Sequence, residues 1–128
     1  MNTYAYTKKL DLSFSEALDQ VEFHLLEQGF WILSRIDVKA KMKEKLWKEM
    51  REYMILWACN PNLAYQAIQE EYEIWLLLPC NVIVYETWEQ VHVSCIIPSA
   101  AMGMIENLAI WNIAKTAEEK LKRAIDTL

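Results

Sequence analysis

At residues 53–61 the chain reads YMILWACNP, and this stretch predicts a β-strand followed directly by the start of an α-helix. Every side chain from Tyr53 to Cys59 is apolar, which is typical of a strand inside a sheet that is shielded on both faces. Asn60 and Pro61 then supply an N-cap side chain and a proline at the first helical position. We therefore expect a helix to follow this strand directly and to end near Glu71.

Helix signals and strand alternation extend this pattern in both directions. Residues 4–12 alternate apolar and polar side chains with the period of a half-buried strand. Ser13 and Glu16 form a capping box that begins a helix, and Gly29 is placed to end it. After Gly29 we expect a strand at 30–36, a Lys-rich helix at 38–49 with Val38, Met42 and Leu46 turned inward, a hairpin of strands at 82–86 and 90–97, and a closing helix whose apolar stripe begins at Ile110.

The resulting order is β-α-β-α-β-α-β-β-α. It predicts an α+β fold, a two-layer sandwich with helices packed on a mainly antiparallel sheet. Because 128 residues fill one domain and no linker interrupts the sequence, residues 1–128 are expected to form a single domain.

Composition excludes several classes of function. Two glycines are too few for a P-loop or a dinucleotide fingerprint, and the net charge of −5 has the wrong sign for nucleic acid. The longest apolar stretch, Ile74 to Tyr85, is too short to cross a bilayer and is broken by Pro79. We expect a cytoplasmic protein with no nucleic-acid partner and no membrane insertion.

Three cysteines are the first candidates for chemistry. Their odd number and apolar surroundings favour reduced thiols. Cys59 directly precedes a helix N-cap, where the helix dipole would favour a reactive thiolate, although the favoured interpretation is a small buried side chain that closes the strand. Cys59 and Cys80 share one sheet edge only if their strands are antiparallel, and these two are the candidate reactive thiols.

The hairpin pattern gives a second set of candidates. If Tyr85 opposes Gln90, Cys80 opposes Cys95 and one face becomes uniformly apolar. The other face gathers Asn81, Tyr85 and His92, which we take as candidate ligand-binding residues. Metal spacing motifs such as Cys-x-x-Cys are absent from the sequence, so no metal ligand set or cofactor is assigned; metal or haem binding through His92, a cysteine or Met102 stays a further alternative. No catalytic residue is assigned either.

Two motifs carry a family resemblance. Cys59-Asn60-Pro61 and the later Leu78-Pro79-Cys80 before a Val-rich strand resemble those of domain-of-unknown-function family 302, as does the junction Gly29-Phe30. The resemblance covers nearly the full chain and implies an α+β fold and a homodimer, without an established activity. One departure is Ile97, which stands before Pro98 where the family often has an acidic residue.

The apolar surplus is the best clue to function. The strand at 53–59 has apolar side chains on both faces, and both must be buried. Trp31, Trp75 and Trp88 add more apolar surface to bury. We therefore expect a homodimeric, non-enzymatic binding module whose sheet face meets a small ligand or partner, with little loss of binding when Cys59 and Cys80 become Ser. The alternative is a sulfur-carrier or redox protein, which predicts rapid alkylation of one thiol near neutral pH.

Overall fold

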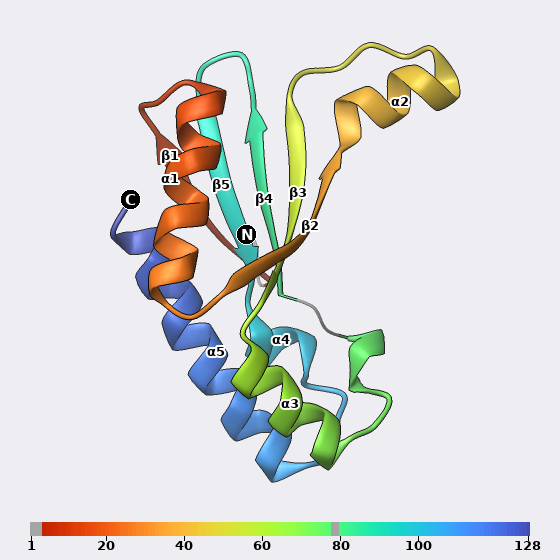
Figure 1. Ribbon diagram of the computed structural model, residues 1–128, viewed down its shortest axis with the longest axis vertical. Coiled ribbons are helices and arrows are strands. Elements are labelled where there is room, and N and C mark those ends of the chain that lie inside the picture. The colour runs from red at the N-terminus through yellow and green to blue at the C-terminus, as the bar shows by residue number, and fades with distance from the viewer. Residues whose placement is uncertain (1–3, 78–79) are drawn as a thin grey trace.

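The computed structural model of the protein describes residues 4–77 and 80–128, and its main feature is a five-stranded antiparallel sheet. The strands lie in the order β1-β5-β4-β3-β2, with helices against one face (Figure 1). This confirms the predicted α+β fold and element order. The elements are β1 (Ala5–Leu10), α1 (Phe14–Glu27), β2 (Trp31–Asp37), α2 (Val38–Leu46), β3 (Tyr53–Cys59), α3 (Pro61–Glu70), the 3₁₀ turn η1 (Ile74–Leu76), β4 (Cys80–Glu86), β5 (Val91–Ile96), α4 (Pro98–Ala101) and α5 (Leu108–Asp126).

Local capping fixes α1 as the sequence predicts. The Ser13 hydroxyl accepts from the Glu16 amide and the Glu16 carboxylate accepts from the Ser13 amide, which completes the capping box. Gly29 follows the helix with φ of +86°, and the next amide, of Phe30, donates to the Leu25 carbonyl. This is a Schellman ending, in which glycine supplies the left-handed residue.

The main core lies between the sheet and the helices α1 and α5. Val82, Val84 and Val93 of the central strands are fully buried against Leu25 of α1 and Leu121 of α5. The predicted stripe of α5 is confirmed, since its buried residues are Ile110, Ala114, Ala117, Leu121, Ala124 and Ile125.

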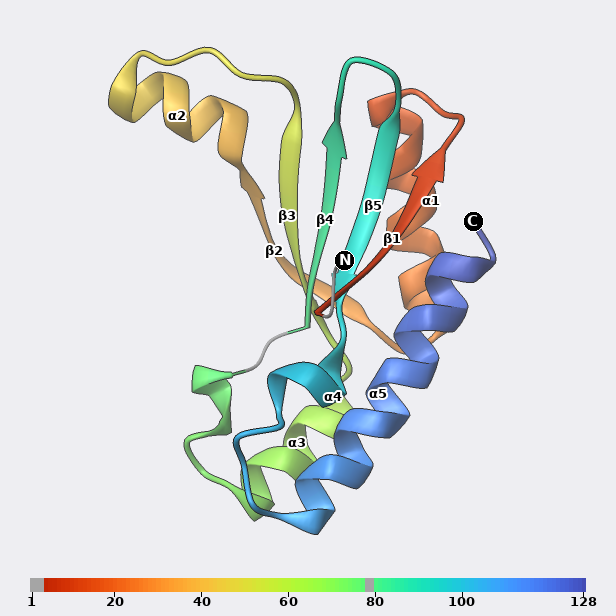
Figure 2. The same cartoon turned by 180° about the vertical axis from the view of Figure 1, so that it is seen from behind.

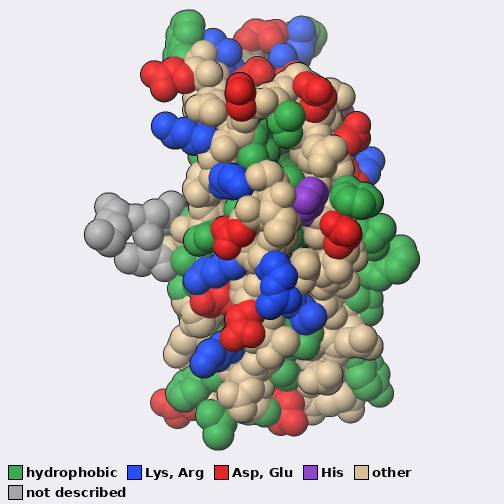
Figure 3. Space-filling view, turned by 90° about the vertical axis from the view of Figure 1, so that its left-hand side faces the viewer, with side chains coloured by type: hydrophobic (Ala, Val, Ile, Leu, Met, Phe, Trp, Pro, Cys, Tyr) green, Lys and Arg blue, Asp and Glu red, His purple; other side chains and the backbone are tan. Residues whose placement is uncertain are grey.

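On the side that faces left in Figure 1, basic and acidic side chains are interspersed along the molecule (Figure 3).

The hairpin of β4 and β5 has the predicted faces but a different register. Its loop is Thr87–Gln90, closed by the Thr87 amide and the Gln90 carbonyl, and lies one residue later than expected. Each cross-strand pair therefore moves by two positions, so that Tyr85 opposes His92. The predicted pairing of Cys80 with Cys95 is wrong: Cys95 opposes Val82, and Cys80 is its diagonal neighbour.

The Lys-rich helix α2 does not pack on the sheet. It projects beyond the edge of the sheet (Figures 1 and 2), and none of its residues is buried. The predicted inward stripe is therefore wrong, because Met42 and Leu46 are exposed and Val38 is half-buried. An amphipathic pattern shows which side of a helix is apolar but not whether the same chain provides a surface for it.

Helices cover the sheet on one face only. Seen from behind, the strands stand in front of α1 and α5 with no described helix over them (Figure 2). Strand β3 lies inside the sheet, between β2 and β4, but its predicted shielding on both faces is not found among the residues that the structure describes. Leu56 and Ala58 are fully buried, whereas Tyr53, Ile55 and Trp57 on the opposite face remain half-exposed.

A second, smaller cluster lies at the end of the sheet where β3 and β4 meet α3. It is built from Ala67, Ile74, Met102, Ile110 and Ala114, contributed by α3, η1, the end of α4, and α5. The short segments η1 and α4 were not expected from the sequence. None of the described helices combines the length and apolar character needed to cross a bilayer.

Candidate functional site

The uncovered side of the sheet, here named the open face, is the first candidate site. Cross-strand partners in an antiparallel sheet point to the same side, so the register assigns its members. They are Ala5, Thr7 and Lys9 of β1, Trp31, Ser34 and Ile36 of β2, Tyr53, Ile55, Trp57 and Cys59 of β3, Asn81, Ile83 and Tyr85 of β4, and His92, Ser94 and Ile96 of β5.

A row of stacked rings crosses three strands of the open face. The rings of Tyr53 and Tyr85 lie 5.7 Å apart at 23°, and those of Tyr85 and His92 lie 4.9 Å apart at 5°. Next to this row, the hydroxyls of Thr7 and Ser94 are hydrogen-bonded at 2.8 Å. Two predicted ligand-binding residues, Tyr85 and His92, are thus in direct contact. The register predicted from the sequence did not place them opposite each other.

Two polar atoms on this face are shielded without a hydrogen-bond partner among the described residues. They are Nδ1 of His92 and Nε1 of Trp57. The Trp57 ring packs edge-on against Trp75 of η1, with centroids 5.6 Å apart. Asn81 is exposed opposite Trp57, four residues or roughly 13 Å along β4 from Tyr85. The third predicted ligand-binding residue therefore shares the face but lies apart from the ring row.

Charge is almost absent from the open face. Within the five described strands, Lys9 is its one formally charged side chain. The remaining members are aromatic, aliphatic or small neutral polar residues. This face is therefore suited to burial against another apolar surface rather than to holding a charged ligand.

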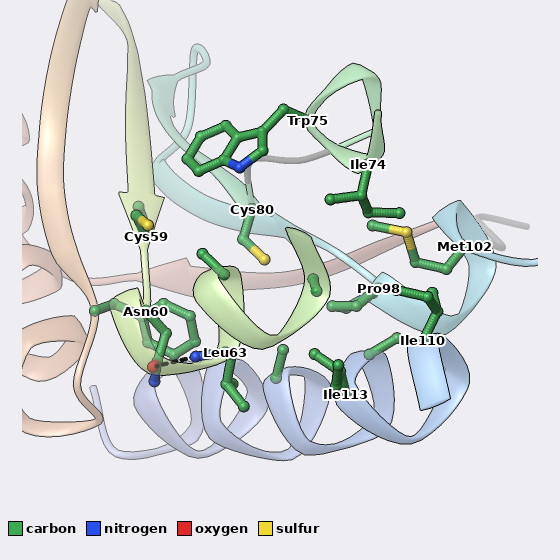
Figure 4. Close-up of a pocket in the computed structure, with 16 residues that line it drawn as sticks. Cys59, Asn60, Leu63, Ile74, Trp75, Cys80, Pro98, Met102, Ile110 and Ile113 are labelled. Atoms are coloured by element: carbon green, nitrogen blue, oxygen red, sulfur yellow. Dashed lines mark hydrogen bonds between the residues drawn. The ribbon is translucent and has the colours of Figure 1, made fainter. Parts of the chain in front are cut away.

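An apolar pocket at the other end of the sheet is the second candidate site. It lies where β3 and β4 end over α3, η1, α4 and α5, and its volume is about 40 Å³ (Figure 4). Cys59 and Cys80 both line it, because β3 and β4 are antiparallel and Ala58 opposes Cys80. The structure thus has the one strand geometry that brings the two candidate thiols to a common sheet edge.

Burial weakens the acidity of all three thiols. It raises the pKa of Cys59, and it raises the pKa of Cys80 to about 12, with the neighbouring Cys59 adding to the shift. The pKa of Cys95 is raised to about 12, again mainly by burial. All three cysteines are free. For Cys59 the helix dipole was expected to lower the pKa, and burial instead raises it. With raised pKa values, all three thiols are protonated near neutral pH.

Asn60 explains how the Cys59-Asn60-Pro61 motif shapes this region. Its side-chain oxygen accepts from the Leu63 amide at 3.3 Å and caps α3, as the dashed line in Figure 4 marks. Its side-chain nitrogen donates to the Gln28 carbonyl at 3.5 Å, beside Gly29. Asn60 thereby ties the start of α3 to the end of α1, a link that the sequence reasoning missed although both segments belong to the resemblance motifs.

Metal-binding groups do not converge in the part of the chain that the structure describes. No set of three or more His, Cys, Asp or Glu residues there is placed to hold an ion. Met102 lines the pocket with Cys59 and Cys80, whereas His92 belongs to the open face and does not line it. The proposed metal ligands are therefore divided between two sites. Leu78 and Pro79 of the Leu-Pro-Cys motif lie outside the described residues.

Comparison with known proteins identifies relatives of the whole fold. A family model described as "Domain of unknown function DUF302" matches residues 6–128. A crystal structure of an uncharacterized conserved DUF302 protein from Bacillus stearothermophilus is similar over 98% of both chains, with 26% sequence identity and a TM-score of 0.91. No curated protein matches the chain.

Proposed function

The chain belongs to the DUF302 family, whose function is unknown, and from the chemistry of its own surfaces we propose that it is a homodimeric binding module whose copies pack open face to open face. The observation that carries this proposal is the open face itself. It spans all five strands, is almost free of charge, and has no described helix over it apart from the contact of Trp75 in η1 with Trp57.

The area of this face suits a dimer. Five strands ~4.8 Å apart and six residues of ~3.3 Å each give roughly 24 by 20 Å, or ~480 Å² per copy. Two copies would then bury about 1,000 Å² before side-chain relief is counted, which is near the lower bound of specific interfaces. Removing apolar surface from water contributes roughly 25 cal/mol of free energy per Å². Pairing is therefore favoured over leaving Ile55, Ile83 and the stacked rings exposed to solvent.

Charge distribution favours a second copy over an unrelated partner. The segment of residues 38–51, here named the α2 arm, contains six basic and two acidic side chains and so carries +4. Because the net charge of the whole chain is −5, the rest of the chain carries a charge of −9. An arm of one sign that projects past the sheet of a body of the opposite sign is complementary to another copy of itself.

In this dimer the predicted ligand-binding residues face the partner copy. Tyr85 and His92 lie in the middle of the contact, and Asn81 lies toward the end near Trp57. The shielded atoms Nδ1 of His92 and Nε1 of Trp57 then meet polar groups of the second copy or waters held between the copies.

The test is to place a carboxylate at the centre of the open face. Ile83 opposes Ile55 and Ser94, so Ile83→Glu in a packed interface leaves two unpaired carboxylates across the symmetry axis. We expect the wild-type protein to sediment as a dimer and Ile83→Glu as a folded monomer. The matched control is Leu26→Glu, at a 49% exposed position of α1, which should remain dimeric. A monomeric wild-type protein at micromolar concentration contradicts the proposal, as does an Ile83→Glu variant that stays dimeric.

A further inference from the structure

The apolar pocket has walls that offer nothing to a charged ligand. Its lining is aliphatic and aromatic apart from the thioether of Met102, the thiols of Cys59 and Cys80, and the amide of Asn60. The Asn60 side chain is already committed, since its oxygen accepts from Leu63 and its nitrogen donates to Gln28. The two thiols are protonated near neutral pH, which is consistent with their apolar surroundings. A charged molecule would thus lose its hydration here without compensation.

Three polar contacts keep the walls of this pocket in place. Asn60 ties the start of α3 to the end of α1. Asn107, the N-cap of α5, donates to the Glu71 carboxylate at 3.3 Å and so joins the far end of α3 to α5. The Ser99 amide and hydroxyl both donate to Glu118, which fixes α4 on α5. Because each wall is anchored separately, the small side chains between them, such as Ala67 and Ala114, do not close the gap.

The volume and the lining together define the occupant. A pocket of about 40 Å³ exceeds the ~10–15 Å³ that a single water needs, so it has room for a small molecule. Waters there would find few hydrogen-bond partners, whereas apolar atoms lose nothing by entering a dry apolar site. We propose that this pocket is a binding site for small uncharged apolar molecules, held between α3, α4 and α5.

This site is independent of the proposed dimer. Its residues come from the ends of β3 and β4 and from the elements packed beyond that end of the sheet. It meets the open face only at Cys59, the last residue of β3, and where Trp75 contacts the edge of Trp57. A monomeric Ile83→Glu variant should therefore retain the site, and the failure of either proposal leaves the other standing.

Xenon is the probe for this site because it is apolar, uncharged and monatomic. In amide-resolved NMR under increasing xenon pressure, we expect saturable shifts confined to pocket residues such as Ala67, Met102 and Ala114. Ala114→Leu replaces a methyl group by an isobutyl group at the pocket wall and should abolish saturation. The matched control, Ala109→Leu, lies five residues earlier on α5 and does not line the pocket, so it should bind xenon like the wild-type protein.

Three results would overturn the proposal: shifts that rise linearly with pressure, shifts spread over the surface, or saturation that survives in Ala114→Leu. If that variant does not fold, Ala64→Leu on α3 fills the pocket from the opposite wall at a half-buried position and takes its place.

Discussion

Replacing Gly29 by alanine tests the junction of α1, β2 and α3. Gly29 has φ of +86°, a conformation that disfavours residues with a Cβ by about 1–2 kcal/mol. The new Cβ would also lie 3.1 Å from Nδ2 of Asn60, so that side chain must shift away from the Gln28 carbonyl. Loss of this hydrogen bond adds about 0.5–1.5 kcal/mol. We therefore expect Gly29→Ala to lower the free energy of unfolding by about 2–3 kcal/mol.

The assay is urea unfolding followed by circular dichroism, at one protein concentration for all variants because dimerisation would couple stability to concentration. Gly103→Ala is the matched control. Its Cβ would meet only the Ala100 and Ser99 carbonyls at ordinary distances of 3.6 and 3.7 Å. That variant should be neutral or up to about 1 kcal/mol more stable, through a smaller unfolded-state entropy. A Gly29→Ala variant within about 0.5 kcal/mol of wild type, or an equal loss in Gly103→Ala, refutes the reasoning.

A double-mutant cycle separates the two contributions. Asn60→Ala alone removes the cap of α3 and should lower the free energy of unfolding by about 1 kcal/mol. In the double variant the crowded amide is gone, so the combined loss should be smaller than the sum of the single losses by about 0.5–1 kcal/mol. Strict additivity would show that Asn60 does not contribute to the intolerance of Gly29 to a side chain.

Two further predictions concern ionisable groups. With its pKa raised from 9.0 to about 12, Cys80 should carry ~1,000-fold less thiolate at pH 8 than a thiol of unshifted pKa and should react more slowly with iodoacetamide, and a pH-rate profile levelling off below pH 10 would contradict this. Partial burial alone would raise the pKa of Glu118, but hydrogen bonds from Ser99 and Lys122 outweigh it and lower the pKa below 4.5. The stability that Glu118 contributes is thus present above pH 4.5 and lost as pH falls through its folded-state pKa. Ser99→Ala should lower the free energy of unfolding by about 1 kcal/mol at pH 7 and by progressively less below pH 4.5; a difference that does not change with pH would argue against the Glu118 contact.

Features that depend on residues close together in the sequence were predictable. The capping box of Ser13 and Glu16, the ending at Gly29 and the buried stripe of α5 depend on residues within one helix and its flanks. The faces of the hairpin were also predictable, because a strand has a period of two and a shift of two positions leaves every side chain on its side. For the same reason the grouping of Tyr85 and His92 survived an incorrect register, while the pairing of Cys80 with Cys95 did not.

Features that depend on distant segments were not predictable in this way. The short segments η1 and α4 span three and four residues and carry too little periodicity to be recognised. The pocket exists because Asn60, Asn107 and Glu118 anchor three walls independently, and each of these contacts joins residues at least 19 positions apart. The raised pKa of Cys59 likewise depends on burial by other elements, whereas the sequence showed only the adjacent helix N-terminus.

The pattern of β3 carries a different kind of information. Its unbroken apolar run is appropriate to a strand covered on both faces, and within this chain the helices cover one. On the covered face Leu56 and Ala58 are fully buried, whereas Ile55 and Trp57 on the other side are half-exposed, although all four are apolar. A half-buried antiparallel strand needs apolar residues only at alternate positions. Apart from the contacts of Tyr53 with Tyr85 and of Trp57 with Trp75, the second apolar set in β3 has no covering layer among the described residues, and the proposed intermolecular contact on the open face would supply one.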